Sequence, residues 1–175
     1  MKIQDTKALG FTLLELMIGS AILIVALAGL LAAFIGCFRL NETAKNLTIA
    51  VTGAQEKLEE IRNYNFDTVV GSYSPGGSQG NTFTIDPATW LAVANQRAVI
   101  YILDPQTGAI LNTGPMADPG LSLYEVRIAV CWRQKGGRML GEDDNLNGAL
   151  NAGEDDNGNG YIDSPAQLAT LIAER

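Results

Sequence analysis

Residues 141–163 combine acidic, amide and glycine residues in a tandem with a period of twelve residues. The two copies read GEDDNLNGALNA and GEDDNGNGYID, and together they hold seven acidic residues and no Lys or Arg. The first copy fits the loop pattern D-x-[DN]-x-[DN]-G-x5-E. In such loops, oxygen atoms at positions one, three, five and seven converge on a hard cation, and a Glu at position twelve closes the shell. This spacing predicts that the tandem binds one or two calcium ions.

Every ligand expected here is an oxygen atom, and position seven of each copy contributes its backbone carbonyl. The first copy is complete, whereas the twelfth position of the second copy is Ala166. We expect either Asp163, at the ninth position, to compensate, or Asp144 and Asp156 to be shared between the two sites. The expected ligands are Asp143, Asn145, Asn147, Ala149, Asn151 and Glu154 in the first copy, and Asp155, Asn157, Asn159, Tyr161 and Asp163 in the second. A flexible acidic loop would explain the composition but not the repeat.

The expected role of this metal is structural. Without calcium, the acidic residues of the tandem repel one another, so we expect the strand that follows to dock poorly until metal binds. Neutral Asn ligands predict weak sites, of about 10⁻⁴–10⁻³ M, the class suited to extracellular calcium. No long amphipathic helices flank the tandem, which argues against a sensor pair that opens a groove.

Short strands surround the tandem and must position it. The clearest period-two pattern lies in residues 123–133, where Cys131 points to the face opposite the larger residues, such as Tyr124 and Trp132. We expect the tandem to be an insertion in a hairpin formed by the last two strands. The predicted strands are Thr82–Ile85, Arg97–Leu103, Leu123–Arg133, Arg138–Leu140 and Gln167–Ala173.

A single helix of about 50 residues is expected ahead of the strands, because no proline interrupts residues 11–74. Its second half carries apolar residues at alternating spacings of four and three, which form one face of an amphipathic helix. These residues are Leu40, Ala44, Leu47, Val51, Ala54, Leu58 and Ile61. We expect this face to pack on an antiparallel sheet, giving an α+β fold with the helix on one side.

The first half of this helix holds one acidic residue, Glu15, followed by an uncharged run from Leu16 to Phe38. The run is long enough to cross a bilayer, which takes roughly 20 residues. A carboxylate within such a segment costs on the order of 2.5–3.5 kcal/mol, so Glu15 is expected to meet a partner. Cleavage after Gly10 would supply one, because Phe11 would then carry a free amine.

The segment Gly10-Phe11-Thr12-Leu13-Leu14-Glu15-Leu16 resembles the type IV prepilin signature, which pilins share with the pseudopilins of type II secretion. The resemblance implies that a prepilin peptidase cleaves between Gly10 and Phe11 and methylates the Phe11 amine. It also implies that Glu15 guides the docking of subunits into a filament. The implied partners are other pilins or pseudopilins, an inner-membrane assembly platform and the lipid bilayer. An ordinary signal anchor has no need for the acidic residue.

Further stretches resemble PilV-type minor pilins, namely Ala54–Arg62, Asn63–Phe66, Val130–Trp132 and Gln167–Ile172. The resemblance implies a pilin-like fold and a structural role, as a minor pilin of a type IV pilus. The expected organisation is a cleaved leader at 1–10, a membrane-spanning assembly half-helix at 11–38, an amphipathic half-helix at 39–63 and a β domain at 64–175 that includes the tandem. We expect one span of the bacterial inner membrane, the β domain in the periplasm, and later a place in a surface pilus or a periplasmic pseudopilus.

Two alternatives stay open at this point, a minor pseudopilin and a membrane-anchored, calcium-dependent adhesin. An enzyme is not expected, because the chain has no histidine, the commonest general base. Outside the tandem, 12 acidic residues balance 12 basic ones, so no basic excess favours nucleic acid. Cys37 and Cys131 are too few for a disulfide framework and are expected to be free thiols.

Overall fold

The computed structural model of the chain describes residues 11–86, 95–114 and 119–174. The predicted leader, residues 1–10, and with it Gly10, lies outside the described residues. The chain forms two compact units, which meet in sequence between Glu42 and Thr43. Helix α1, Leu13–Arg62, provides the described helix of the first unit and continues into the second, so the predicted long helix is confirmed.

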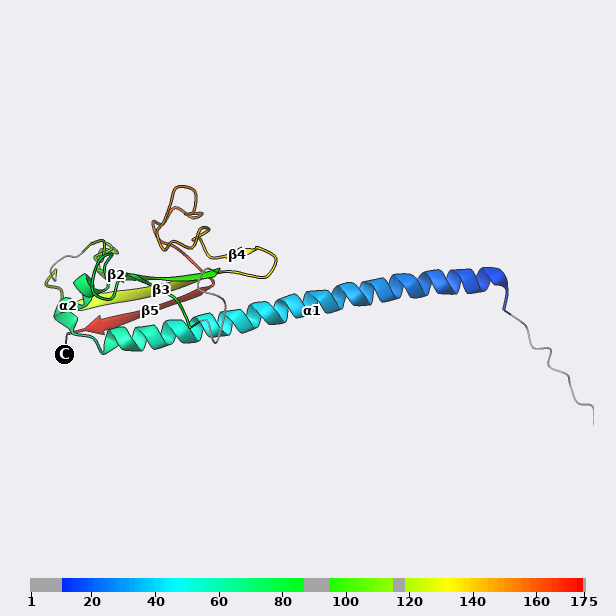
Figure 1. Cartoon of the computed structure of the whole chain (residues 1–175), viewed down its shortest axis with the longest axis horizontal. Helices are drawn as coiled ribbons and strands as arrows, with labels where there is room; N and C mark the ends of the chain where they lie inside the picture. Colours follow the sequence, from blue (N-terminus) through cyan, green and yellow to red (C-terminus); the bar gives the residue numbers. More distant parts are fainter. Residues whose placement is uncertain (1–10, 87–94, 115–118, 175) are drawn as a thin grey trace, which may run out of the picture. The chain divides into compact units, whose positions relative to one another are not determined.

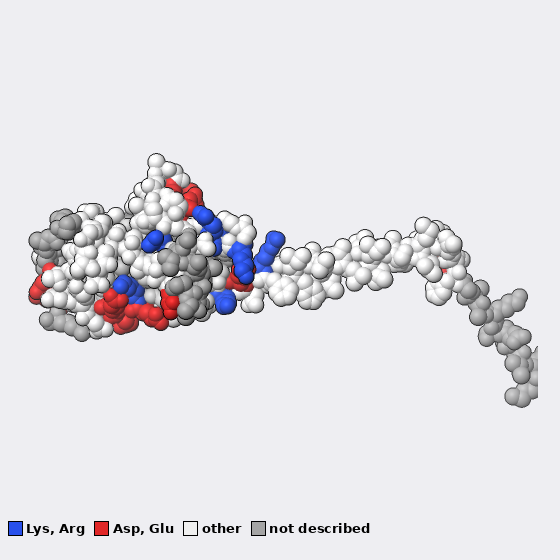
Figure 2. Space-filling model, viewed as in Figure 1, with Lys and Arg blue, Asp and Glu red and all other residues white. Residues whose placement is uncertain are grey.

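In the first unit, the apolar side chains of α1 are exposed from Leu13 to Phe38. Among the described residues, α1 is the one helix long and apolar enough to cross a membrane, and none of its most apolar stretch is buried within the protein. Figure 2 shows an almost uncharged surface along this segment. Such a surface needs either lipid or the helices of other subunits to cover it.

The second unit is built on a five-stranded antiparallel sheet. Its strands are β1 (Thr82–Phe83), β2 (Gln96–Leu103), β3 (Leu123–Arg133), β4 (Met139–Leu140) and β5 (Ala166–Ala173). Strand β3 is central, because β2 pairs along one edge of it while β4 and β5 both pair with it. All five predicted strands are present, with β1 shorter than expected (Figure 1).

The expected hairpin between the last two strands is wrong. Strand β4 pairs with Trp132 and Arg133, at the end of β3, whereas β5 pairs with β3 from Leu123 to Val130. Strand β2 already occupies the other edge of β3 over both stretches, so β4 and β5 follow one another along the same edge. The tandem therefore connects two strands that share a partner instead of pairing with each other.

The second half of α1 packs on one face of this sheet and closes the main core. Large side chains of β3, including Tyr124, Ile128 and Trp132, are fully buried there. On α1, the predicted residues Ala54, Leu58 and Ile61 are buried as expected. The first two positions of the predicted stripe are wrong, because Leu40 and Ala44 are exposed, whereas Leu47 and Val51 are half-buried and pack against the core. The buried positions there are the small or polar residues Asn46, Ala50 and Gly53.

The small residues explain this shift of the helix face. At Gly53, a Cβ atom added to the backbone would lie only 2.7 Å from Cγ1 of Ile85. The absent side chain thus lets the helix backbone approach Ile85 more closely than a larger residue would permit. The close approach of α1 to Ile85, and not hydrophobicity alone, therefore determines which face of α1 is buried near Gly53.

A short helix, α2 (Phe66–Ser72), was not anticipated from the sequence. Asn65 caps it, because its side chain accepts a hydrogen bond from the Asp67 amide at 3.0 Å. The residue after α2, Tyr73, is fully buried and its hydroxyl donates to Oε1 of Glu60 at 3.0 Å. This bond joins the end of α2 to α1.

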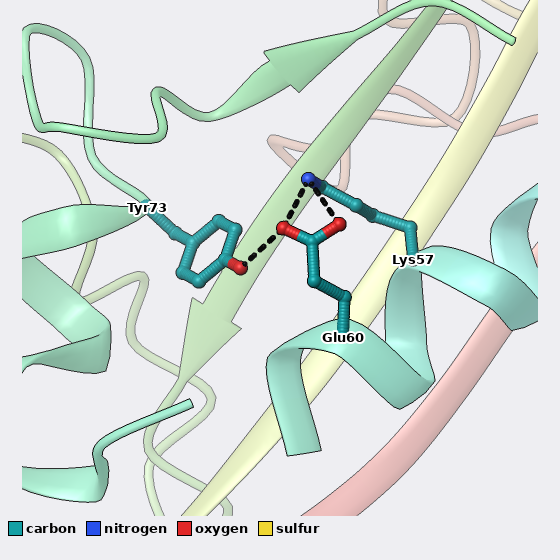
Figure 3. Close-up of polar contacts among 3 residues, drawn as sticks. All are labelled: Lys57, Glu60 and Tyr73. Atoms are coloured by element: carbon teal, nitrogen blue, oxygen red, sulfur yellow. Dashed lines mark hydrogen bonds and ion pairs between the residues drawn. The ribbon is translucent and has the colours of Figure 1, made fainter. Parts of the chain in front are cut away.

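Lys57 completes this polar cluster (Figure 3). Its Nζ atom lies 2.7 Å from Oε1 of Glu60 and 5.4 Å from the centre of the Tyr73 ring. Burial by itself raises the pKa of Glu60, but the hydrogen bonds from Lys57 and Tyr73 and the charge of Lys57 outweigh it, so the pKa is lowered. Burial, followed by the bond to Glu60 and its charge, raises the pKa of Tyr73.

We predict that Glu60→Gln lowers the pKa of Tyr73 without restoring its ordinary value, because burial remains. The measurement is an alkaline titration of tyrosine ring carbons by NMR on the full chain in micelles, with Glu59→Gln as the matched control. Since the folded-state pKa of Tyr73 is raised, its contribution to stability is complete below pH ~10 and is lost as the pH rises through the folded-state value. An unchanged pKa of Tyr73 in Glu60→Gln would contradict the proposed coupling.

Candidate functional site

The first candidate site is the start of α1. Thr12 precedes the helix, and its hydroxyl oxygen accepts a hydrogen bond from the backbone amide of Glu15 at 3.2 Å. Thr12 and Glu15 thus stand at the first and fourth places of a T-x-x-E capping box. Sequence reasoning had not assigned Thr12 a role, although this spacing was a sufficient signal for one.

Phe11 and Glu15 are both exposed in the described structure, and the Phe11 side chain retains 81% of its accessible surface. Glu15 lies in the first turn, where the dipole of the helix favours a negative charge. Among the described residues, no cation pairs with Glu15. Phe11 is therefore accessible to a peptidase that cleaves the peptide bond ahead of it. The Glu15 carboxylate is available to pair with a cation from another molecule.

The second candidate site is the tandem, in which the first copy forms a compact turn around Asp143. The carboxylate of Asp143 is fully buried and accepts hydrogen bonds from the amides of Asn147 at 3.0 Å and Gly148 at 2.8 Å. The side-chain oxygen of Asn145 accepts from the Asn147 amide at 2.9 Å, and that of Asn147 accepts from the Ala149 amide at 2.7 Å.

The second copy repeats this arrangement bond for bond. Asp155 accepts from the amides of Asn159 at 3.1 Å and Gly160 at 2.9 Å. Asn157 accepts from the Asn159 amide at 3.0 Å, and Asn159 accepts from the Tyr161 amide at 2.7 Å. The sequence repeat is thus also a structural repeat of two loops.

The backbone conformation repeats as well. Position four has a positive φ in both loops, 59° at Leu146 and 73° at Gly158. Position six is Gly148 with φ 77° in the first loop and Gly160 with φ 79° in the second. A leucine rarely adopts such a conformation, so the loop hydrogen bonds and the burial of the Leu146 side chain must hold it there.

The closing carboxylates of the two loops come from different positions. Glu154 accepts from the side-chain amide of Asn145 and from that of Asn151, both at 2.9 Å. In the second loop, Asp163 accepts from the side-chain amides of Asn157 and Asn159, both at 2.6 Å. Asp163 therefore accepts hydrogen bonds from two Asn side chains of the second loop, as Glu154 does in the first.

The carboxylates of the loops differ in their electrostatic surroundings. Burial raises the pKa of Asp143, and although the amides of Gly148 and Asn147 oppose this, the net pKa is raised. Burial also acts to raise the pKa of Glu154, but hydrogen bonds from Asn151 outweigh it and the pKa is lowered. The pKa of Asp155 is lowered, chiefly by the Gly160 amide.

Among the described residues, no group of three or more His, Cys, Asp or Glu side chains lies close enough to hold a metal ion. The expected ligand set of each loop holds two carboxylates, and its other members are Asn side chains and a backbone carbonyl, which such a group does not include. The described contacts bring Asn145, Ala149, Asn151 and Glu154 together through a chain of hydrogen bonds. In these bonds the side-chain nitrogens of Asn145 and Asn151 donate, and the oxygen atoms of Glu154 and Ala149 accept. Carboxylate, amide and carbonyl oxygens are the ligand types that calcium accepts.

The tandem also covers the second face of the sheet, which sequence reasoning had not foreseen. Leu146 of the first loop and Ile162 of the second pack against Val99, Tyr101 and Leu103 of β2 and Cys131 of β3. Figure 1 shows the loops on the face of the sheet opposite α1. The Tyr101 hydroxyl accepts from the Ile162 amide at 3.0 Å.

Cys131 points away from the main core, as predicted, but it is fully buried in this second cluster. Both cysteines are free. Burial raises the pKa of the Cys131 thiol to about 12, so it stays protonated at neutral pH. These observations describe a packing residue and not a reactive thiol.

Comparison with known proteins gives one match. Residues 5–31 match the family described as the Prokaryotic N-terminal methylation motif. No curated protein matches the chain, and no solved structure matches it. The family match supports a type IV pilin-like protein or pseudopilin that is processed by prepilin peptidase and anchored by one membrane span.

We predict that Gly141→Ala destabilises the second unit, because its φ of 102° disfavours a side chain and a Cβ atom there would overlap Sγ of Cys131. Gly136→Ala is the matched control, since Gly136 has φ 98° and no heavy atom within 4 Å of the added carbon. The backbone conformation costs each variant about 1–2 kcal/mol. Overpacking adds about 1–3 kcal/mol for Gly141→Ala alone. Urea unfolding of the full chain in micelles measures both, and equal losses would contradict the packing of the tandem on β3.

Proposed function

We propose that this chain is a structural subunit of a type IV pilus, incorporated as a minor pilin after cleavage between Gly10 and Phe11. The observation that carries the proposal is Glu15, one carboxylate at the head of an exposed, otherwise uncharged helical segment. The matched methylation motif covers the same residues.

The charge of Glu15 needs a partner that neutralises it. The capping bond from the Glu15 amide to Thr12 satisfies a backbone group and leaves the carboxylate available. In a bilayer or a filament core, an uncompensated carboxylate is costly, and the amine of a processed Phe11 in a neighbouring subunit supplies the opposite charge. Assembly then pairs the Glu15 carboxylate of one subunit with the Phe11 amine of another, and each of these charges is costly in an apolar environment without a partner.

We further propose that calcium stabilises the second unit through the two loops of the tandem. Asp143, Asn145, Asn147, the Ala149 carbonyl, Asn151 and Glu154 would hold one ion, and Asp155, Asn157, Asn159, the Tyr161 carbonyl and Asp163 a second. Calcium would offset the mutual repulsion of the loop carboxylates. Because Leu146 and Ile162 pack on the sheet, ordering of the loops reinforces the second core.

We predict that Glu15→Gln abolishes incorporation into filaments while leaving cleavage intact. Glu42→Gln, which removes an equal charge from the same helix, is the matched control and retains incorporation. Mass spectrometry of the protein from its native host reports the mature N-terminus and methylation of Phe11, and immunoblots of sheared filaments report incorporation. Native protein that retains residues 1–10, or Glu15→Gln filaments at the normal level, would overturn the proposal.

The same experiment separates a pilus from a secretion pseudopilus. Co-purification of the mature protein with pilus components supports the minor pilin, whereas co-purification with a type II secretion apparatus supports a pseudopilin in its place. Both outcomes retain the processing and membrane anchoring that the motif supports.

We predict that about 10 mM calcium raises the free energy of unfolding of the second unit by about 1.4–2.7 kcal/mol for each loop that binds an ion, the range for dissociation constants of about 10⁻³–10⁻⁴ M. Urea unfolding in calcium, in equimolar magnesium and in chelator makes the measurement. Glu154→Gln should lose the gain of the first loop, whereas the control Asp156→Asn should retain it. Equal stabilisation by magnesium, or an equal loss in the control, would show charge screening instead of a specific site.

A further inference from the structure

A groove lies between α1 and the segment that begins with strand β1, within the second unit. It has a volume of about 650 Å³ and is lined by residues of α1 between 48 and 60 and, opposite them, by residues 83–86. Phe83 and Ile85 give the groove apolar walls. Its volume lies in the range of protein pockets that hold a ligand.

Carboxylates determine the sign of the charge in this groove. Glu56, Glu60 and Asp86 line it, against one cation, Lys57. Lys57 is already paired, because its Nζ atom lies 2.7 Å from Oε1 of Glu60 (Figure 3). Glu56 is exposed and forms no ion pair with any residue that the structure describes. An occupant with a positive charge on an aliphatic stem therefore matches both the carboxylates and the apolar walls.

The chain itself carries such side chains in the turn between β3 and β4. Lys135 and Arg138 are exposed there, and neither forms an ion pair within the described part of the chain. A hydrogen bond from the Gln134 amide to the Arg138 carbonyl at 2.9 Å closes the turn. Gly136 and Gly137, with φ of 98° and 84°, make it tight. The two cations thus belong to a narrow loop that a groove can accept.

The turn is held away from the Glu56 carboxylate of its own molecule. Nε2 of Gln134 donates to Oγ1 of Thr43 at 2.8 Å, which fixes the turn beside that residue of α1. Glu56 lies 13 residues after Thr43 on the same helix, a rise of about 20 Å. This distance exceeds the reach of a Lys side chain. Lys135 therefore meets a Glu56 carboxylate only on another molecule.

We propose that the β3–β4 turn of one copy docks in the groove of a second copy, with Lys135 paired to Glu56. The proposal rests on the filament of the proposed function, because copies anchored through the same end of α1 point in the same direction. A contact between two different surfaces of identically oriented copies is heterologous, so it can continue from copy to copy without closing. Neighbouring copies would be offset by about 20 Å along α1. The chain would then enter filaments as runs of copies and not as isolated subunits.

A cationic turn fits the groove better than an uncharged partner does. An apolar segment in the groove would remove Glu56 from water without supplying an opposite charge, which is costly. The tandem is a poorer partner for the turn, because carboxylates of Asp143, Glu154 and Asp163 already accept hydrogen bonds within their loops. The groove combines an unpaired carboxylate with walls that accept an aliphatic stem.

The test is photo-crosslinking in the native host, with the full chain carrying benzoylphenylalanine at Thr52, an exposed residue that lines the groove. A second, epitope-tagged copy in the same cells shows whether a crosslink joins two copies. Sheared filaments are irradiated, and mass spectrometry maps the joined peptides. We expect crosslinks from Thr52 to residues 134–138 of the tagged copy. Gln55, exposed on the same helix but outside the groove, is the matched control and should give none to that turn.

Charge reversal tests the pairing itself. Glu56→Lys and Lys135→Glu should each lower the yield of the Thr52 crosslink about fivefold, because each brings like charges together. Both substitutions in every copy restore opposite charges and should bring the yield back to within about twofold of the original. Asp156→Lys, which reverses an exposed acidic residue of the tandem, is the matched control and should leave the yield unchanged.

Filaments that contain the chain but give no crosslink from Thr52 to the turn of a second copy would overturn the docking and leave the proposed function intact. A crosslink to a different subunit, an equal loss in Asp156→Lys, or a double variant as weak as the single ones would also overturn it. Absence of the mature chain from sheared filaments would overturn the proposed function and the docking with it.

Discussion

The placement of one carboxylate constrains the whole chain. Glu15 stands at the head of an uncharged segment that ends at Phe38, and a charge in that position is tolerated only if something compensates it. Before processing, Thr12 organises the helix start around the Glu15 amide, and the helix dipole favours the carboxylate. After cleavage ahead of Phe11, a new amine would offer a stronger partner. The same carboxylate can therefore serve a waiting subunit and an assembled one, through different neighbours.

Strand β3 organises the second unit because both of its faces are buried. Tyr124, Ile128 and Trp132 face α1, while Cys131 faces the loops of the tandem. A sheet covered on only one face would expose Val99, Tyr101 and Leu103 of β2. The tandem is thus a cover for the sheet as well as a candidate metal site, and any change in the order of its loops acts directly on the packing of β2 and β3.

Local sequence patterns predicted most of the helices and strands. Tertiary contacts determined which face of α1 is buried and which strands pair. The period-two run of β3 and the proline-free length of α1 were sufficient to place both. The buried face of α1 near Gly53 was missed, because it depends on how closely Ile85 approaches and not on hydrophobicity. The expected hairpin is absent because β4 and β5 each pair with a different stretch of β3. Local sequence patterns do not reveal such long-range pairing. In the tandem, the sequence spacing indicated two repeated loops, but not the burial of Leu146 and Ile162 on the sheet.

The acidic tandem and the cationic turn that precedes it are neighbours of opposite charge in the second unit. Residues 133–163 hold three cations (Arg133, Lys135 and Arg138) against the seven acidic residues of the tandem, a net charge of −4. The Arg133 guanidinium already contacts the Asp144 carbonyl. Two calcium ions, as proposed, would bring the net charge of this region to zero. Occupancy of the loops would then act on the stability of the second unit through Coulomb interactions.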